Sequence, residues 1–141
     1  MTLIPNFKVG LVRGHGSPRD WEGSFAIEPG ATLEDVHALT QNAVQFDDDH
    51  GYEFYIARTF KSRPSEVFDD ENGGIYRRTL ASLFPLPAKH ALFYCFDPGD
   101  NWIFEIKAAR GGPLVEACGE AESGLMGALG TRPVQYPDGD E

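Results

Sequence analysis

The chain has 141 residues, of which 41% are hydrophobic and 24% are charged. A chain of this length can enclose a hydrophobic core without disulfides or a structural metal, and this composition favours neither an intrinsically disordered protein nor a membrane protein. Twelve basic residues against 22 acidic ones give a formal net charge of −10, which opposes direct binding to the phosphate backbone of nucleic acids. We therefore expect a folded domain with no direct contact to nucleic acid.

Cysteine content and hydropathy indicate the compartment. Cys95 and Cys118 are too few for a disulfide framework. The segment MTLIPNFKVG lacks the charged region and apolar run of a signal peptide, and no apolar stretch approaches the roughly 20 residues of a membrane span. These features predict a cytoplasmic protein without a membrane segment.

Two segments near the N-terminus have the period of a half-buried strand. Apolar and polar residues alternate over residues 7–12 and again over residues 21–27. Between them the segment GHGSPRD breaks the pattern, and Pro29-Gly30 ends the second segment. We expect these two strands to form a hairpin.

Residues 33–46 form the clearest helical pattern. Thr32 and Asp35 have the spacing of an N-terminal capping box. Apolar side chains then recur at helical intervals along one stripe, at Leu33, Val36, Leu39, Ala43 and Phe46.

Three further strands follow the helix. Residues 52–57 alternate as a third strand, and a short helix over residues 80–84 is ended by Pro85. The segment ALFYCF at 91–96 is apolar on both faces, which is typical of a central strand covered on both sides. The segment DPGD at 97–100 has the composition of a type II turn, so residues 90–107 are predicted to form a hairpin whose second strand is WIFEIK.

The fold class follows from these elements. We predict a single compact α+β domain with a mostly antiparallel sheet of about five strands packed on one principal helix, residues 33–46. Residues 1–110 would form its core. Residues 111–141 would be a glycine-rich, acidic extension of the same domain, with QYPDGDE as a frayed tail.

A run of carboxylates directly follows the predicted helix. Asp47 and Asp48 lie at the negative end of the helix dipole, which is unfavourable by some tenths of a kcal/mol for each, so a cation, an arginine or solvent should offset them. With His50, Asp97 and Asp100 they could ligate a divalent metal if both turns lie at the same end of the sheet. Alternatively, Asp47 or Asp48 shapes the turn by accepting backbone N–H bonds.

Three other residues join the candidates. Glu53 could approach the same turns, and Trp102, at the start of a strand beside acids, is predicted to be half exposed. His37 lies at the border of the helix's apolar stripe, where it either makes a hydrogen bond at the core edge or acts as a ligand. The candidate binding residues are Asp47, Asp48, His50, Glu53, Asp97, Asp100, Trp102 and His37.

Two segments also carry a family resemblance. They are TLEDVHALTQNAVQFDDDHGYEF and, about forty residues later, FYCFDPGDNWIFEI. The pattern resembles an uncharacterised bacterial family named after the third open reading frame of an Ri plasmid, whose members are also labelled TnpR-like passenger proteins of insertion elements. The matching positions are Leu33, His37, Phe46, Asp47, Asp48, His50, Glu53, Phe54, Tyr94, Phe96, Asp97, Gly99, Asp100 and Trp102.

The resemblance covers roughly residues 5–110 and implies a compact α+β domain whose strands curl around the principal helix. It implies no activity. Family members usually have Trp at the position of Phe46, an aromatic residue at Pro98 and a basic stretch near Trp21-Glu22, and they end in a Pro-Pro-Glu-rich segment. This chain lacks those features, and with them any inherited basic contact to DNA.

Reaction motifs are missing from the sequence. There is no phosphate loop or nucleophile elbow, and no positive charge flanks Cys95. We therefore expect a non-enzymatic binding or interaction module for a protein partner with a basic surface. One alternative is a metal-dependent hydrolase or nuclease that uses His50, Asp47, Asp97 and Asp100 around a divalent ion, the one cofactor considered. The other is an acidic regulator of a DNA-binding protein.

Overall fold

The structure is a computed structural model and describes residues 2–14, 21–47, 51–97, 101–108, 114–117, 124–133 and 135. For residues 2–5, 114–117 and 124–126 it describes the backbone alone.

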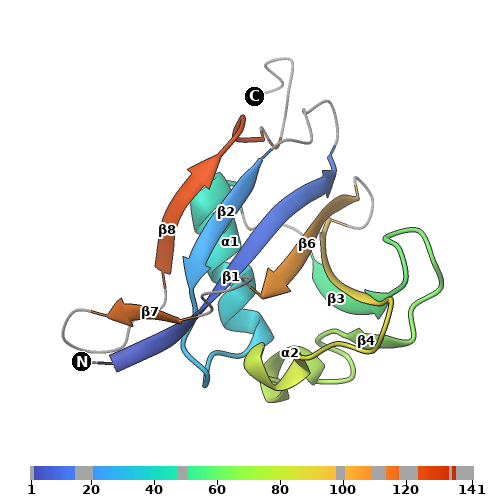
Figure 1. Ribbon diagram of the computed structural model, residues 1–141. Helices are drawn as coiled ribbons and strands as arrows, with labels where there is room; N and C mark the ends of the chain where they lie inside the picture. The colour runs from blue at the N-terminus through green and yellow to red at the C-terminus, as the bar shows by residue number, and fades with distance from the viewer. Residues whose placement is uncertain are drawn as a thin grey trace.

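One antiparallel sheet makes up most of the molecule (Figure 1). Seven strands follow one another in the order β4-β3-β5-β6-β1-β2-β8, and an eighth, β7, pairs with β1 beside this path. The strands are β1 (Thr2–Arg13), β2 (Glu22–Ala26), β3 (Tyr52–Ala57), β4 (Glu66–Phe68), β5 (Ala91–Phe96), β6 (Trp102–Ala108), β7 (Leu114–Ala117) and β8 (Gly124–Leu129).

Both predicted hairpins are confirmed. β1 and β2 pair in antiparallel register with Phe7 opposite Phe25, and β5 and β6 pair with Phe96 opposite Trp102. Residues 98–100 of the predicted type II turn lie outside the described residues.

The main helix is α1 (Leu33–Val44), and it begins at the predicted capping box. The Asp35 amide donates to Thr32 Oγ1 at 3.3 Å, and the Thr32 amide donates to Asp35 Oδ2 at 3.0 Å. The helix ends two residues earlier than predicted because Gln45 turns into the left-handed region, with φ 59°.

The other helical segments are short. They are α2 (Gly74–Arg77) and a 3₁₀ turn at Ala81–Leu83, which stands where a helix over residues 80–84 was expected. In the part of the chain that the structure describes, no helix has the length and apolarity of a membrane span.

The prediction of about five strands packed on one principal helix is wrong, because the sheet dominates the fold. β4 has three residues, too few to show a strand period in the sequence. β7 and β8 lie in the glycine-rich segment, where local strand propensity is poor. Their pairing with β1 and β2 supplies the stabilisation that the local sequence lacks.

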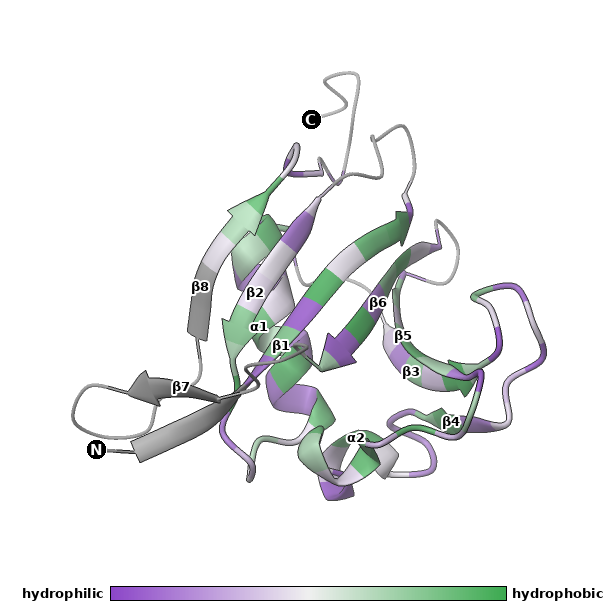
Figure 2. Ribbon diagram, viewed as in Figure 1, coloured by the Kyte–Doolittle hydropathy of each residue, from purple (hydrophilic) through white to green (hydrophobic). Residues whose placement is uncertain are grey.

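The core lies between α1 and one face of the sheet, which we call the inner face. α1 lies behind β1 and β2 in Figure 1, and polar and apolar segments alternate along β1 in Figure 2. The largest fully buried side chains of this core are Trp102, Tyr94, Phe25, Phe54, Phe96 and Phe104. Aromatic rings of this size bury the most apolar area per residue, so they dominate the stability of the fold.

A polar group also lies inside this core. The Tyr94 hydroxyl accepts a hydrogen bond from Gln41 Nε2 at 3.0 Å and lies 2.5 Å from His37 Nδ1, to which it can donate its proton. The His37 ring stacks on Tyr52 with ring centroids 3.6 Å apart. Three side chains on two elements therefore fix α1 over β5 by directional bonds as well as by apolar contact.

Loss of the helix cap should be measurable. Thr32→Ala removes the oxygen that satisfies the Asp35 amide, and we expect unfolding to become easier by about 1 kcal/mol in urea denaturation. Thr32→Ser keeps the hydroxyl and should stay close to the wild type. Equal losses in both variants would contradict a capping role.

The buried Tyr94 hydroxyl provides a second test. Tyr94→Phe leaves Gln41 Nε2 and His37 Nδ1 without this partner in the core, so we expect a loss of about 1–3 kcal/mol in the free energy of unfolding. Tyr76 is 52% exposed, and Tyr76→Phe is the matched control, with an expected change within about 0.5 kcal/mol. A neutral Tyr94→Phe would show that the hydroxyl network adds no stability.

Candidate functional site

The other face of the sheet, which we call the outer face, carries a pocket of about 440 Å³ beside β3, β5 and β6. The segment 58–65, which connects β3 to β4, forms its wall. We call it the outer pocket. Its lining residues are Arg13, Glu53, Tyr55, Phe60, Lys61, Ser62, Pro64, Cys95, Asn101 and Ile103.

Apolar side chains on the outer face explain why the wall forms here. Tyr55, Ala57, Phe93, Cys95 and Ile103 make a second buried cluster on this side of the sheet, and Phe60 of the wall packs against it. Leaving that cluster in water would cost roughly 25 cal/mol for each Å² of apolar surface. The cover supplied by segment 58–65 creates the pocket at its margin.

Hydrogen bonds fix the wall to the sheet. The Tyr55 hydroxyl donates to the Phe60 carbonyl at 2.8 Å, and the Ser65 amide donates to the Ile56 carbonyl at 2.8 Å. Within the wall, the hydroxyls of Thr59 and Ser62 lie 2.7 Å apart. The pocket is thus held in shape by the backbone of β3 and by its own aromatic lining.

The environment of the pocket raises three pKa values. Burial, followed by the nearby Asp69 carboxylate, raises the pKa of Glu53. Burial, followed by Glu53 and Asp97, raises the pKa of Cys95 to about 12, although Arg13 acts in the opposite direction. Burial is also the largest cause that raises the pKa of Tyr55 to about 12.

These shifts define the chemistry that the outer pocket offers. At neutral pH the Cys95 thiol and the Tyr55 phenol keep their protons, so neither is an activated nucleophile. Glu53 contributes a partly buried carboxyl group, while Arg13 and Lys61 contribute positive charges. The arrangement supplies an aromatic wall with charged and hydrogen-bonding groups, a combination suited to holding a ligand.

Among the sequence-predicted site residues that the structure describes, Glu53 is the one that lines this pocket. Two others, His37 and Trp102, lie in the inner core instead, with exposed fractions of 4% and 0%. The prediction that Trp102 is half exposed is wrong, because its ring packs edge-on against Phe46 with centroids 4.8 Å apart. A tryptophan that starts a strand beside acids can still point inward when the strand's register requires it.

Gly51, just before β3, and Asp97, just after β5, lie side by side because these two strands pair. The Asp97 amide donates to the Gly51 carbonyl at 2.9 Å, and Asp97 accepts from the Asn101 amide at 2.7 Å through its own carbonyl. Asp97 is 8% exposed and has a φ of 56°. Its described contacts shape the turn.

Asp47 is exposed and is held through its backbone by Gln135. Its amide donates to Gln135 Oε1 at 2.5 Å, and Gln135 Nε2 donates back to the Asp47 carbonyl at 3.1 Å. Arg132 adds a hydrogen bond to Gln45. Gln135 is 6% exposed, so the prediction of a frayed tail fails at this first residue of QYPDGDE, and the sequence around it gives no signal of the contact.

The predicted metal site falls partly outside the described residues. Asp48, His50 and Asp100 belong to the segments 48–50 and 98–100, of which nothing is described. Among the residues that are described, no group of three or more His, Cys, Asp or Glu side chains could hold a metal ion.

Sequence reasoning missed most of the outer pocket, including Arg13, Phe60, Lys61 and Asn101. One signal was available, since an ALFYCF strand with no polar residue requires apolar cover on both faces. The sequence does not reveal that segment 58–65 supplies the cover.

Comparisons with known proteins place the chain in a family. No curated protein matches it in sequence. Its fold is similar to a crystal structure of MM3350, a protein of unknown function from Methanosarcina mazei Go1, with a TM-score of 0.58 and 19% identity over 82% of this chain and 66% of that chain. Residues 21–119 match the model of the family described as plasmid pRiA4b ORF-3-like protein, and the chain belongs to that family.

Proposed function

We propose that this chain is a non-enzymatic binding module that holds a segment of a protein partner in the outer pocket. The observation that carries the proposal is a pocket of about 440 Å³ that combines a partly buried carboxyl group with Tyr55 and Cys95, whose pKa values are raised to about 12. Among the described lining residues, neither the Cys95 thiol nor the Tyr55 phenol is activated as a nucleophile, which supports recognition of a ligand in this pocket.

A peptide segment suits this lining better than a compact charged metabolite. Tyr55, Phe60 and Pro64 offer an aromatic and apolar wall for one side chain. Glu53 and Asn101 can bond the backbone or a donor of the same segment, and Lys61 can pair with an acidic neighbour. Mixed recognition of this kind is usual at protein interfaces.

The charge of the whole chain supports a basic partner. A net charge of −10 attracts a positively charged surface over long distances and accelerates its encounter with the chain. The pocket would then select among such partners by the side chain that it admits. Partial burial raises the pKa of Glu53, and a hydrogen-bond donor from the partner would stabilise its charged form.

The raised pKa of Glu53 predicts a pH dependence of stability. The folded state binds this proton more tightly than the unfolded state, so Glu53 lowers the free energy of unfolding as the pH rises from the unfolded pKa through the raised folded pKa. In urea denaturation, Glu53→Gln should gain stability relative to the wild type across this window and keep the gain at neutral pH.

Ser62→Ala is the control for this series because it changes the rim of the pocket without removing a titrating group. Its difference from the wild type should not vary with pH. A Glu53→Gln difference that is constant, or that shrinks as the pH rises, would show that the carboxylate is not destabilised in the fold.

The binding proposal can be tested with random peptides displayed on phage. Peptides enriched on the purified chain should bind Glu53→Lys/Phe60→Ala at least about tenfold more weakly, equivalent to about 1.4 kcal/mol, in calorimetry with the synthetic peptide. They should also shift the backbone amide signals of Tyr55, Cys95 and Asn101.

Asn42→Lys, an exposed position on α1, is the matched control and should leave the peptide affinity unchanged. Two results would overturn the proposal. One is that no peptide is enriched above a protein-free control. The other is that enriched peptides bind the double variant as tightly as the wild type.

A further inference from the structure

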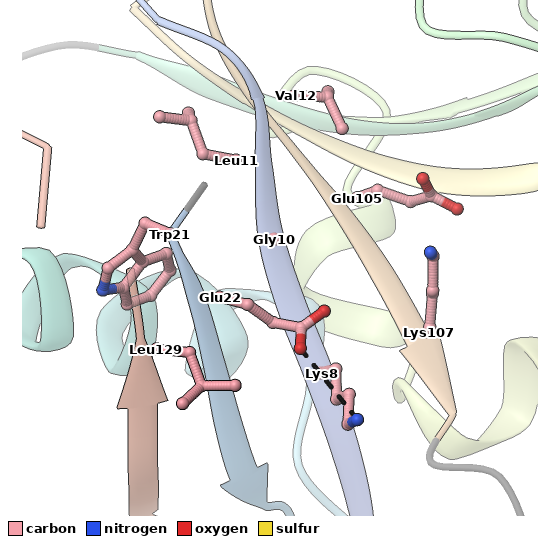
Figure 3. Close-up of a pocket in the computed structure, with 9 residues that line it drawn as sticks. All are labelled: Lys8, Gly10, Leu11, Val12, Trp21, Glu22, Glu105, Lys107 and Leu129. Atoms are coloured by element: carbon pink, nitrogen blue, oxygen red, sulfur yellow. Dashed lines mark ion pairs between the residues drawn. The ribbon is translucent and has the colours of Figure 1, made fainter. Parts of the chain in front are cut away.

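A second hollow, of about 290 Å³, lies on the open part of the outer face around Gly10 (Figure 3). We call it the Gly10 hollow. It has Gly10 at its centre and Lys8, Glu22, Glu105, Lys107 and Leu129 around it. These residues come from the four strands β6, β1, β2 and β8, and the hollow exists because residue 10 has no side chain to fill it.

Strand register sorts the charges around the hollow into two rows. Glu105, Gly10 and Glu22 are partners across β6, β1 and β2, and they form an acidic row that continues to Leu129 on β8. The second row lies two residues further along the strands. In it Lys107 pairs with Lys8, and Lys8 pairs with Ser24. Ser24 in turn pairs with Gly127 on β8. The basic row therefore runs beside the acidic row at a spacing of about 6.7 Å.

We propose that two copies of this chain dock face to face through these two rows. A two-fold axis in the interface, parallel to the rows and between them, places the basic row of each copy over the acidic row of the other. Lys8 then enters the partner's Gly10 hollow between two glutamates, and Lys107 faces the partner's Glu105. The surface is self-complementary, as an isologous dimer interface must be.

The surroundings favour a second copy as the occupant. Lys8 and Lys107 are directly opposed on neighbouring strands, which is destabilising for like charges. Within the chain, Lys8 reaches Glu22 only at 4.0 Å. The rows contribute two positive and two negative charges, so together they are neutral on a chain of net charge −10 and add no net repulsion between two copies.

An exposed leucine adds an apolar contact to the same arrangement. Leu129 is 71% exposed. The two-fold axis places it over the partner's Gly127, where a side chain would meet nothing within 4 Å. Aligned sheets pack about 10 Å apart with their strands rotated by about 30°, and the long lysine stems can absorb that rotation.

Charge reversal of each row tests the dimer. Sedimentation velocity at low salt should show a dimer for the wild type and monomers for Lys8→Glu/Lys107→Glu and for Glu22→Lys/Glu105→Lys. An equal mixture of these two variants should regain the dimer, since one face is then wholly acidic and the other wholly basic. At about 1 M salt, where the Debye length is about 3 Å, the wild-type dimer should weaken by roughly tenfold or more.

These variants distinguish specific pairing between the two charged rows from an effect of the net charge of the chain. Glu22→Lys/Glu105→Lys brings the net charge closer to zero, so general repulsion predicts tighter association, whereas the proposal predicts its loss. Arg63→Glu/Lys89→Glu changes two exposed charges elsewhere and should leave the dimer intact. Leu129→Asp changes an exposed edge residue, so it tests the same interface without risk to the core and should also give monomers.

Four outcomes would overturn the proposal. They are a monomeric wild type, a dimer that persists in both charge-reversed variants, a dimer that persists in Leu129→Asp, and a mixture of two folded variants that stays monomeric. Thermal unfolding of each variant shows whether it is folded.

Discussion

The strand β5 sets the central constraint on this fold, since all six of its residues are apolar or weakly polar and five of them are buried. Leu92, Tyr94 and Phe96 point to one side, and Phe93 and Cys95 point to the other. Both faces of the sheet must therefore be covered at this strand. α1 covers the inner face, and the segment 58–65 covers the outer face. The outer pocket lies at the margin of this segment.

The outer face changes character from one edge to the other along a single row of paired residues. From β3 to β8 the row reads Tyr55, Phe93, Glu105, Gly10, Glu22 and Leu129. Its aromatic end lies under the wall and next to the outer pocket, whereas its charged end is open. One face of one sheet thus offers two surfaces of different chemistry, and a ligand in the pocket and a second copy on the open strands would not compete for the same residues.

Much of the fold could be read from local pattern. The capping box fixed the start of α1, and the alternation of residues in β1, β2, β3 and β6 identified strands that the structure contains. β5 was identified by its continuous apolar run, and the strands with neither pattern, β4, β7 and β8, were missed. β8 contains two glycines and no β-branched residue, and only its pairing with β2 makes it a strand. Prediction therefore failed where tertiary contact, not local preference, decides the structure.

The candidate site was harder to predict for a related reason. Glu53 was predicted as a site residue because it could approach the two acidic turns, yet its neighbours in the pocket, Arg13 and Asn101, come from distant parts of the chain. His37 was predicted from its place at the border of the helical apolar stripe, and Trp102 from its place at a strand start beside acids. Both side chains are buried in the core. The sequence shows which residues have side chains able to bind a ligand. Whether such a side chain points into the core or toward solvent depends on how its helix or strand packs against the others.

The position of β1 has a consequence for the limits of the domain. β1 lies outside the residues 21–119 that match the family, yet it stands between β6 and β2 in the sheet. A fragment that began at residue 21 would lack β1. Its sheet would fall into two pieces, β4-β3-β5-β6 and β2-β8, each with a new unpaired edge, and the core would lose the buried side chains of β1. The strand that joins the two halves of the sheet thus lies outside the segment that the family model matches.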